Sequence, residues 1–195
     1  MPRRQDSYYF RAKKESLRSR ASYKLQEMQE KFEILNEGDV VLEFGASPGG
    51  WTQIVLSLTS ASVIAVDISP MDPLENVIFI KRDLNDPRVE DDIKEALAGL
   101  GMKEVDAVLS DAMVKASGDK NRDHASSYLL CKRVMELSRI FLKQDGNVVM
   151  KQFQGDLTQQ FLNEWKKDYR FSKVTSTKAT RSGSREIYII FKHRR

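Results

Sequence analysis

Apolar segments of strand length alternate with longer amphipathic segments along most of the chain. Short apolar runs bounded by turn residues are typical of buried strands, and amphipathic helices between them connect parallel strands. The alternation therefore predicts an α/β fold built on a mainly parallel sheet. The seven expected strands cover residues 40–44, 62–67, 77–81, 105–110, 147–152, 171–177 and 186–192. The five expected helices cover residues 19–32, 51–58, 87–100, 125–143 and 157–168.

The length of the chain fits a single domain. A chain of 195 residues can bury a sizeable core but is too short for two full domains. We therefore expect one domain over residues 1–195, with a basic N-terminal extension over residues 1–18. No apolar run reaches the roughly 18 residues that span a bilayer, and the N-terminus lacks the apolar core of a signal peptide. We expect a soluble, cytoplasmic monomer without a membrane partner.

The net charge of +4 hides an uneven distribution along the chain. Residues 1–24 hold eight Lys and Arg against two acidic residues, and residues 173–195 hold seven against one, so the middle has a net charge of −8. If the basic ends meet in space, they form a positive surface suited to phosphates. Tyr8, Tyr9 and Phe10 lie among the N-terminal charges and could stack on unpaired bases. A disordered basic tail is the alternative.

Cysteine and histidine do not suggest a metal site. The lone Cys131 excludes an intrachain disulfide, and its place in an amphipathic segment is typical of a small core residue. His124 and His193 are too far apart in sequence to form a spaced pair of metal ligands. We expect no metal, and we assign the histidines no role.

The run Glu-Phe-Gly-Ala-Ser-Pro-Gly-Gly-Trp at residues 43–51 follows an apolar strand and leads into an expected helix. Glycines at 45, 49 and 50 allow positive φ and close backbone approach, and the helix start offers unpaired N–H groups. The spacing matches neither the dinucleotide fingerprint nor the phosphate-binding P-loop, which excludes a dinucleotide-dependent oxidoreductase. An acidic residue before this turn suits a cofactor with an amino-acid moiety, and S-adenosylmethionine is the obvious candidate.

Acidic residues stand where three expected strands end, at Asp67, Asp83 and Asp111. In an open sheet these ends line one edge, so the carboxylates could surround a ligand held by the glycine turn. Asp67 lies 22 residues beyond Gly45, about the spacing of a carboxylate that binds ribose hydroxyls. Asp83 could accept a hydrogen bond from an adenine amino group. A single strand-end Asp is more often a helix cap or a turn former, but three at matching positions beside the glycine turn favour a binding site.

Lys151 interrupts an apolar run at the end of an expected central strand. Buried lysines are rare unless they have a partner or a chemical task, although a strand-end lysine can also extend to solvent. Burial favours the neutral form of the Lys151 amine, which can act as a base. A second cation nearby has the same effect, and Lys24, beside the apolar stripe of the first helix, could supply it. Carboxylates from Asp111 and Glu186 would act oppositely, orienting the lysines and favouring their charged forms.

Two segments outside the strands and helices are candidates for substrate contact. Residues 112–123 form a long irregular stretch directly after Asp111, where open α/β sheets bind ligands. Residues 178–186, Lys-Ala-Thr-Arg-Ser-Gly-Ser-Arg-Glu, could bind phosphates, or form a simple hairpin turn with solvated charges.

Several segments together resemble the FtsJ/RrmJ family of S-adenosylmethionine-dependent RNA ribose 2′-O-methyltransferases. The resemblance is carried by Ser-Arg-Ala-Ser-Tyr-Lys-Leu at 19–25, the run at 43–51, Val-Asp-Ile-Ser-Pro-Met at 66–71, Leu-Ser-Asp at 109–111, Lys151, and Arg-Ser-x-Ser-x-Glu-x-Tyr ending at Tyr188. It implies a Rossmann-like, seven-stranded methyltransferase sheet with an antiparallel last strand and helices on both faces.

The resemblance also implies roles for individual residues. Lys24, Asp111, Lys151 and Glu186 match the catalytic tetrad, in which Lys151 takes the proton of the ribose 2′-hydroxyl. The cofactor-contacting positions are Glu43, Gly45, Gly49, Trp51, Asp67, Asp83 and Asp111, with Glu43 standing where many members have Asp. The basic candidates for RNA binding are Arg3, Arg4, Arg11, Lys13, Lys14, Arg18, Arg20, Arg181 and Arg185.

The compact form most resembles the ribosomal RNA branch, which modifies a uridine in the A loop of large-subunit RNA. Ribosomal RNA or the large ribosomal subunit is therefore the expected partner. A tRNA ribose methyltransferase and a non-catalytic RNA-binding assembly factor of the same fold stay open as alternatives.

Overall fold

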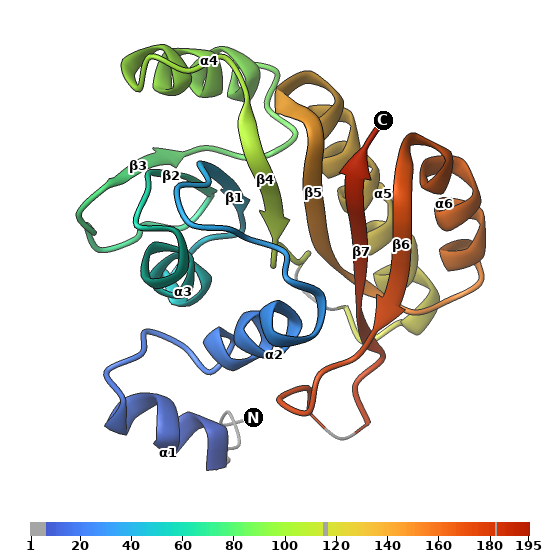
Figure 1. Cartoon of the computed structure of the whole chain (residues 1–195). Coiled ribbons are helices and arrows are strands. Elements are labelled where there is room, and N and C mark those ends of the chain that lie inside the picture. Colours follow the sequence, from blue (N-terminus) through green and yellow to red (C-terminus); the bar gives the residue numbers. More distant parts are fainter. Residues whose placement is uncertain (1–6, 115–116, 182) are drawn as a thin grey trace.

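The computed structural model describes residues 7–114, 117–181 and 183–195 (Figure 1). Within these residues, seven strands form one sheet: β1 (Val41–Phe44), β2 (Val63–Asp67), β3 (Val77–Lys81), β4 (Val105–Ser110), β5 (Leu142–Phe153), β6 (Tyr169–Thr175) and β7 (Glu186–Arg194). The helices are α1 (Ser7–Lys14), α2 (Ser22–Phe32), α3 (Gly50–Thr59), α4 (Val89–Gly99), α5 (Lys120–Phe141) and α6 (Leu157–Trp165), the last followed by the 3₁₀ helix Lys166–Asp168.

The strand order is β3-β2-β1-β4-β5-β7-β6, and the pairs from β3 to β5 are parallel. Strand β7 runs antiparallel between β5 and β6. The expected strand count and the antiparallel last strand are confirmed. Because the order reverses direction between β1 and β4, the carboxyl ends of these two strands form the switch point where open α/β sheets bind ligands.

Helices cover both faces of the sheet, as expected. On one face, α4, α5 and α6 pack on alternate side chains such as Leu42 and Val108. On the other face, α2 and α3 pack on the intervening side chains, such as Val41 and Leu109. The two-residue repeat of a strand sends successive side chains to opposite faces, so a sheet covered on both sides needs continuous apolar strands.

Two element boundaries differ from the sequence-based expectation by five residues. Helix α5 begins at Lys120 because the Asp119 carboxylate accepts hydrogen bonds from the Asn121 and Arg122 amides, an N-cap within the segment expected to be irregular. Strand β5 begins at Leu142, directly after α5, because Leu142 pairs with Val105 before the register shifts. The other boundaries shift by three residues or fewer.

The N-terminal extension is folded where the structure describes it, which corrects the alternative of a disordered tail for residues 7–18. Helix α1 buries Ala12 in a small apolar cluster with Tyr23 and Ala179. The Tyr23 hydroxyl donates to Glu15 Oε2 at 2.8 Å, and the Arg11 guanidinium lies 4.8 Å from the centre of the Tyr23 ring. The extension is therefore docked on α2. Arg3 and Arg4 lie outside the described residues.

The basic N-terminal and C-terminal segments meet only in part. The loop before β7 lies beside the α1 and α2 region, and Arg20 donates to the Ala179 carbonyl (Figure 1). Strand β7 then runs to the opposite edge of the sheet, where Arg194 donates to the Ser138 and Leu142 carbonyls at the end of α5. The expected common positive surface is therefore limited to the part of the C-terminal segment before β7.

Buried residues confirm one expectation and revise another. Cys131 is 2% exposed, and burial raises the pKa of its thiol to about 12, as suits an inert core residue. His124, which we assigned no role, is also buried and links two elements. Its Nδ1 donates to the Phe153 carbonyl at 2.7 Å, and its Nε2 accepts from the Leu157 amide at 3.0 Å.

The position of His124 makes Gly155 a sensitive site. A Cβ added at Gly155 would lie 2.5 Å from two carbons of the imidazole, so we expect Gly155→Ala to lower the free energy of unfolding by about 1–3 kcal/mol. Gly99→Ala is the matched control, because nothing lies within 4 Å of its Cβ, and it should be neutral or stabilising by about 0.5–1 kcal/mol. Urea titration checks both. Equal stability of the two variants would contradict the steric explanation.

Candidate active site

A cavity of about 700 Å³ opens at the carboxyl edge of the sheet. Residues that line it come from helix α1, the segment between α1 and α2, the end of β1 with the glycine turn and the start of α3, the segment after β4, and the loop before β7. Glu43, Gly45, Trp51 and Asp111 are the predicted cofactor residues among them, together with the predicted RNA residues Arg18, Arg20 and Arg181. One cavity therefore brings together residues from both ends of the chain.

The glycines of the turn are required for contacts within the protein. Gly45 has a φ of 71°, and a Cβ there would lie 2.4 Å from the Ala112 backbone, which crosses it from the end of β4. Gly49 has a φ of 101° and precedes α3, and a Cβ there would meet the Arg18 side chain at 2.9 Å. The turn thus places the neighbouring segments close enough to wall the cavity.

Glu43 is a buried acid on the wall of this cavity. Its side chain accepts a hydrogen bond from Thr52 Oγ1 at 2.7 Å through Oε2, whereas Oε1 has no hydrogen-bond partner among the described residues. Burial raises the pKa of Glu43 to about 8. The charges of Asp111 and Asp67 act in the same direction, whereas the Thr52 hydrogen bond acts to lower the pKa. A buried acceptor without a partner is suited to a cationic group of a ligand.

The two other strand-end acids have different surroundings. Asp67 accepts the Ser47 amide at 2.9 Å and the Ser69 amide at 2.7 Å, so it joins the end of β2 to the glycine turn. Asp83 is exposed and accepts the Asn85 amide at 2.8 Å in a local turn, and it does not line the cavity. Ile68, beside Asp67, is 66% exposed. The sequence did not predict it as a candidate site residue.

Two buried lysines each contact a carboxylate beside the cavity. Lys24 Nζ donates to Glu186 Oε1, and both side chains are 11% exposed. Lys151 Nζ lies 2.9 Å from Asp111 Oδ1 and 2.6 Å from the Asp111 carbonyl oxygen. All four predicted tetrad residues are therefore brought together, although they lie on α2, after β4, on β5 and at the start of β7.

Glu186 collects three hydrogen-bond donors on one carboxylate oxygen: Lys24, the Tyr188 hydroxyl at 2.9 Å and the Thr180 hydroxyl at 3.3 Å. Burial acts to raise the pKa of Glu186, but the charge of Lys24 and its hydrogen bond hold that pKa below its ordinary value. Glu186 is therefore ionised and keeps the Lys24 ammonium in place.

Tyr188 is a further candidate for a functional residue. The sequence predicted it only as the end of the Arg-Ser-x-Ser-x-Glu-x-Tyr pattern. Its hydroxyl lies 2.9 Å from Glu186 Oε1 and 3.3 Å from Asp111 Oδ1, so it joins the two ion pairs. Burial and the charges of Asp111 and Glu186 raise the pKa of Tyr188 well above 10, so the phenol keeps its proton. The alternation of β7 could have found it, because Glu186 and Tyr188 share one face of the strand.

Trp51 lines the cavity but is 2% exposed. Its indole Nε1 donates to the Ala21 carbonyl at 2.9 Å, and its ring lies 5.9 Å from that of Tyr188. Trp51 therefore fixes the start of α2, and with it Lys24, against the glycine turn.

Arg18, predicted to bind RNA, has its guanidinium among backbone carbonyls. It donates to Pro48 at 3.3 Å, to Asp72 at 2.6 Å and to Pro73 at 2.9 Å. The Arg18 amide also donates to Gln53 Oε1 on α3 at 2.7 Å. Arg18 thus holds the glycine turn against the segment that follows β2.

The other predicted RNA-binding residues have varied surroundings. Arg11 pairs with Glu15 at 2.8 Å, and Arg185 donates to the Lys120 carbonyl at 2.7 Å. Burial and the charge of Arg181 lower the pKa of Arg20, so these two cations lie near each other. Lys13, Lys14 and Arg181 are exposed.

In the described part of the chain, no group of three or more His, Cys, Asp or Glu side chains is placed to hold a metal ion. No helix in those residues is long and apolar enough to cross a membrane.

The fold and the site define a class of protein: a methyltransferase with a Rossmann-like sheet, a glycine turn after β1 and a cavity at the switch point. A model of the FtsJ-like methyltransferase family matches residues 17–194, and the chain belongs to that family.

The chain is 50% identical to a ribosomal RNA large subunit methyltransferase E of Picrophilus torridus, over 98% of each chain. It is 46% identical to the protein of the same name from Archaeoglobus fulgidus, over 98% of this chain and 97% of the relative. A crystal structure of a Plasmodium falciparum protein, provisionally assigned as a ribosomal RNA methyltransferase, superimposes with a TM-score of 0.82 at 30% identity. That match covers 91% of this chain and 98% of the other.

The contacts of Arg18 predict a role in cofactor affinity. We expect Arg18→Ala to weaken binding of S-adenosylhomocysteine about 10-fold in calorimetry without RNA, because charged hydrogen bonds to three carbonyls are lost. Arg122→Ala, which removes an exposed arginine on α5, should bind like the wild type. Unchanged affinity in Arg18→Ala would instead favour a role in RNA binding alone.

Glu43 predicts a specific dependence of stability on pH. Its pKa is raised from 4.5 to about 8 by folding, so between these values the folded state binds a proton that the unfolded state does not. Stability of the wild type therefore falls as pH rises through this window, by up to ~4 kcal/mol between pH 5 and 8.

Urea unfolding without cofactor tests this dependence. Glu43→Gln cannot titrate, so its stability relative to the wild type should rise from pH 5 to pH 8. Glu104→Gln, at an exposed glutamate, should follow the wild type. Parallel pH curves for the wild type and Glu43→Gln would show that the Glu43 carboxyl titrates normally.

Proposed function

We propose that the protein is an S-adenosylmethionine-dependent RNA ribose 2′-O-methyltransferase, acting on a uridine in the A loop of large-subunit ribosomal RNA. The observation that carries the proposal is the pair of buried lysines, Lys24 and Lys151, each held by a carboxylate, of which Asp111 lines the cavity. A protein that only binds RNA has no evident need for a buried, ion-paired lysine couple at that position.

The described residues fit the expected cofactor. Oε1 of Glu43 has no hydrogen-bond partner among the described residues. It can accept a hydrogen bond from the ammonium group of the cofactor's methionine moiety. Asp67 can accept the ribose hydroxyls while keeping its backbone bonds, because each carboxylate oxygen has two lone pairs. Ile68 offers an exposed apolar face to adenine. The Asp83 carboxylate is bound in its own turn and does not line the cavity.

The bound cofactor supplies an electrophilic methyl group on a sulfonium. With the cofactor bound, Lys151, after its ammonium had lost a proton to solvent, would take the proton of the ribose 2′-hydroxyl while the oxygen bonded to the methyl carbon and the bond from that carbon to the sulfonium sulfur broke. The Asp111 carboxylate and carbonyl would fix the direction of the amine. Lys24, held by Glu186, donates a hydrogen bond to the same oxygen and orients it. Alignment of this kind supplies roughly 7–11 kcal/mol of barrier reduction in favourable cases.

The names of the relatives support ribosomal RNA as the substrate, since the relatives from P. torridus and A. fulgidus are both large-subunit methyltransferases. Exposed cations of α1 and of the loop before β7 supply sequence-independent affinity for phosphates. Methylation of a tRNA ribose would use the same residues and differ only in the RNA. A non-catalytic assembly factor would bind RNA and cofactor without methyl transfer.

Methyl transfer distinguishes these functions. Labelled S-adenosylmethionine is incubated with the protein and ribosomal subunits, free ribosomal RNA or bulk tRNA, and the labelled nucleotide is mapped by nuclease digestion. We expect label on one ribose of large-subunit RNA. Label confined to tRNA would replace the substrate, and no label despite cofactor binding would favour the assembly factor.

Lys151 should be essential to the chemical step. We expect Lys151→Ala to lower the rate of methyl transfer by about 10²–10⁴-fold, because a general base is lost, with little change in cofactor affinity. Lys103→Ala, at an exposed lysine, is the control and should retain full activity. Wild-type turnover in Lys151→Ala would rule out Lys151 as the base.

A further inference from the structure

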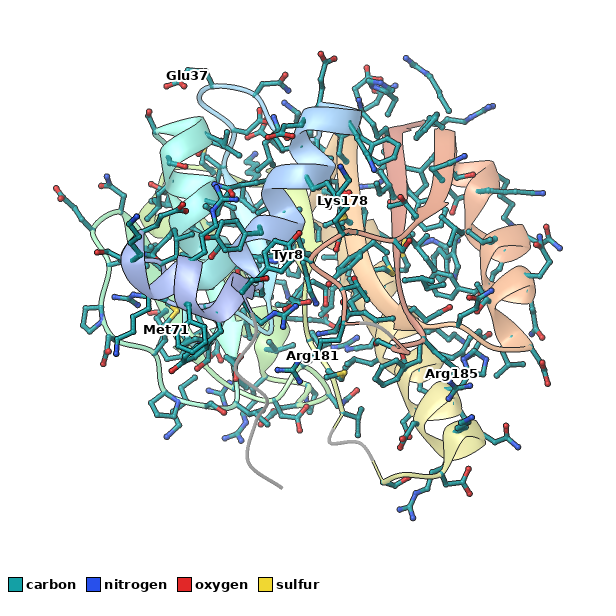
Figure 2. The ribbon with its side chains drawn as sticks, turned by 90° about the horizontal axis from the view of Figure 1, so that it is seen from below. Tyr8, Glu37, Met71, Lys178, Arg181 and Arg185 are labelled. Atoms are coloured by element: carbon teal, nitrogen blue, oxygen red, sulfur yellow. The ribbon has the colours of Figure 1, made fainter. Side chains whose placement is uncertain are left out.

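Three consecutive aromatic residues on α1 have different surroundings. Tyr8 is half-buried, with its ring 5.6 Å from that of Tyr23, and the Arg20 guanidinium lies 5.7 Å from its centre. Tyr9 and Phe10 are 42% and 57% exposed, and their ring centres lie 5.6 Å apart at 82°. Figure 2 shows Tyr8 directed into the molecule, toward the loop that carries Lys178 and Arg181. Tyr8 therefore anchors the helix, while Tyr9 and Phe10 present aromatic surface.

One member of the exposed aromatic pair lines the catalytic cavity. Tyr9 lines the cavity together with Asp111 and with Met113, which is itself 51% exposed. Val114, next in the chain, is 45% exposed. Exposed apolar groups gathered at the mouth of a polar cavity are typical of a binding surface.

The charges around the pair indicate which ligand it fits. Helix α1 carries Arg11, Lys13 and Lys14 in its last turn and no acidic residue in its first turn. Aromatic rings between cations are typical of proteins that bind single-stranded nucleic acid, where the rings stack on bases and the cations contact phosphates. A protein partner with an apolar patch would not need this surplus of positive charge.

The helix is also held rigidly enough to act as a platform. Ala12 is 3% exposed, and the hydrogen bond from Tyr23 to Glu15 ties the end of α1 to α2. A preordered aromatic surface loses less conformational entropy on binding than a mobile one.

We propose that Tyr9 and Phe10 form a stacking platform for unpaired RNA bases, one on each ring, next to the ribose that Lys24 and Lys151 hold; the inference rests on the proposed function. The platform binds any unpaired base, whatever its identity, because every base presents a π face. The protein therefore selects nucleotides in open loops and disfavours the same sequence in a duplex.

Fluorescence titration of the whole protein with a short single-stranded RNA containing 2-aminopurine tests the platform. Tyr9→Ala and Phe10→Ala should each weaken binding about 5- to 150-fold, the range typical of one lost stacking contact. The slope of log affinity against log salt should stay at the wild-type value, because no phosphate contact is lost. Tyr9→Phe, which keeps the ring, should bind within a few-fold of the wild type.

Two controls separate stacking from other effects. Leu129→Ala removes an apolar side chain that is 63% exposed on α5, outside the cavity, and should not change RNA affinity. Lys13→Ala should weaken binding and also flatten the salt dependence, as expected for a phosphate contact. Wild-type RNA affinity in both Tyr9→Ala and Phe10→Ala, with unfolding midpoints unchanged, would overturn the platform. So would a loss of affinity accompanied by a reduced salt slope.

Failure of the platform can be told from failure of the proposed function. If wild-type protein methylates RNA and the two alanine variants bind and methylate it equally well, only the platform is wrong. If wild-type protein binds the fluorescent RNA through Tyr9 and Phe10 but transfers no methyl group to any RNA, the platform stands as a binding surface and the catalytic proposal fails.

Discussion

The pairing of two buried lysines with two carboxylates is the interaction on which this structure depends. Lys24, Asp111, Lys151 and Glu186 come from four different elements, and a buried charge is tolerated only when it is paired. One relative arrangement of α2, β4, β5 and β7 pairs all four groups. Tyr188 couples the two pairs, yet its hydroxyl has one proton for two acceptors and lies nearer to Glu186 than to Asp111. The Asp111 carboxylate is thereby left to Lys151.

Much of the fold could be predicted because its signals are local. The apolar strands, the glycine turn and the strand-end acids are each visible within a few residues, and the rule that parallel strands end at one edge places them together. The tetrad followed from a resemblance spread over the chain. The start of α5 was misplaced although Asp119 is an ordinary N-cap, because the stretch around it was interpreted as a loop. The early start of β5 depends on pairing with Val105, a contact that no local pattern shows.

The roles of the arginines could not be predicted, because an arginine in a basic segment looks the same whether it binds phosphate or a carbonyl. Arg18 bonds to carbonyls 30, 54 and 55 positions away, and Arg185 bonds to one 65 positions away. Such contacts are set by the tertiary fold. The same holds for Tyr8 and Tyr9, neighbours of similar chemistry that the helical rotation sends to different surroundings.

The separation of Lys24 from Glu186, 162 positions along the chain, has a consequence for synthesis of the protein. Strand β7 must enter between β5 and β6 before Glu186 can reach Lys24, and pairings over such distances form slowly. A chain still leaving the ribosome holds the glycine turn and three of the four charged groups 35 residues before it holds the fourth. Maturation of the catalytic centre is thus timed by the emergence of its last strand, and no early fragment carries a complete site.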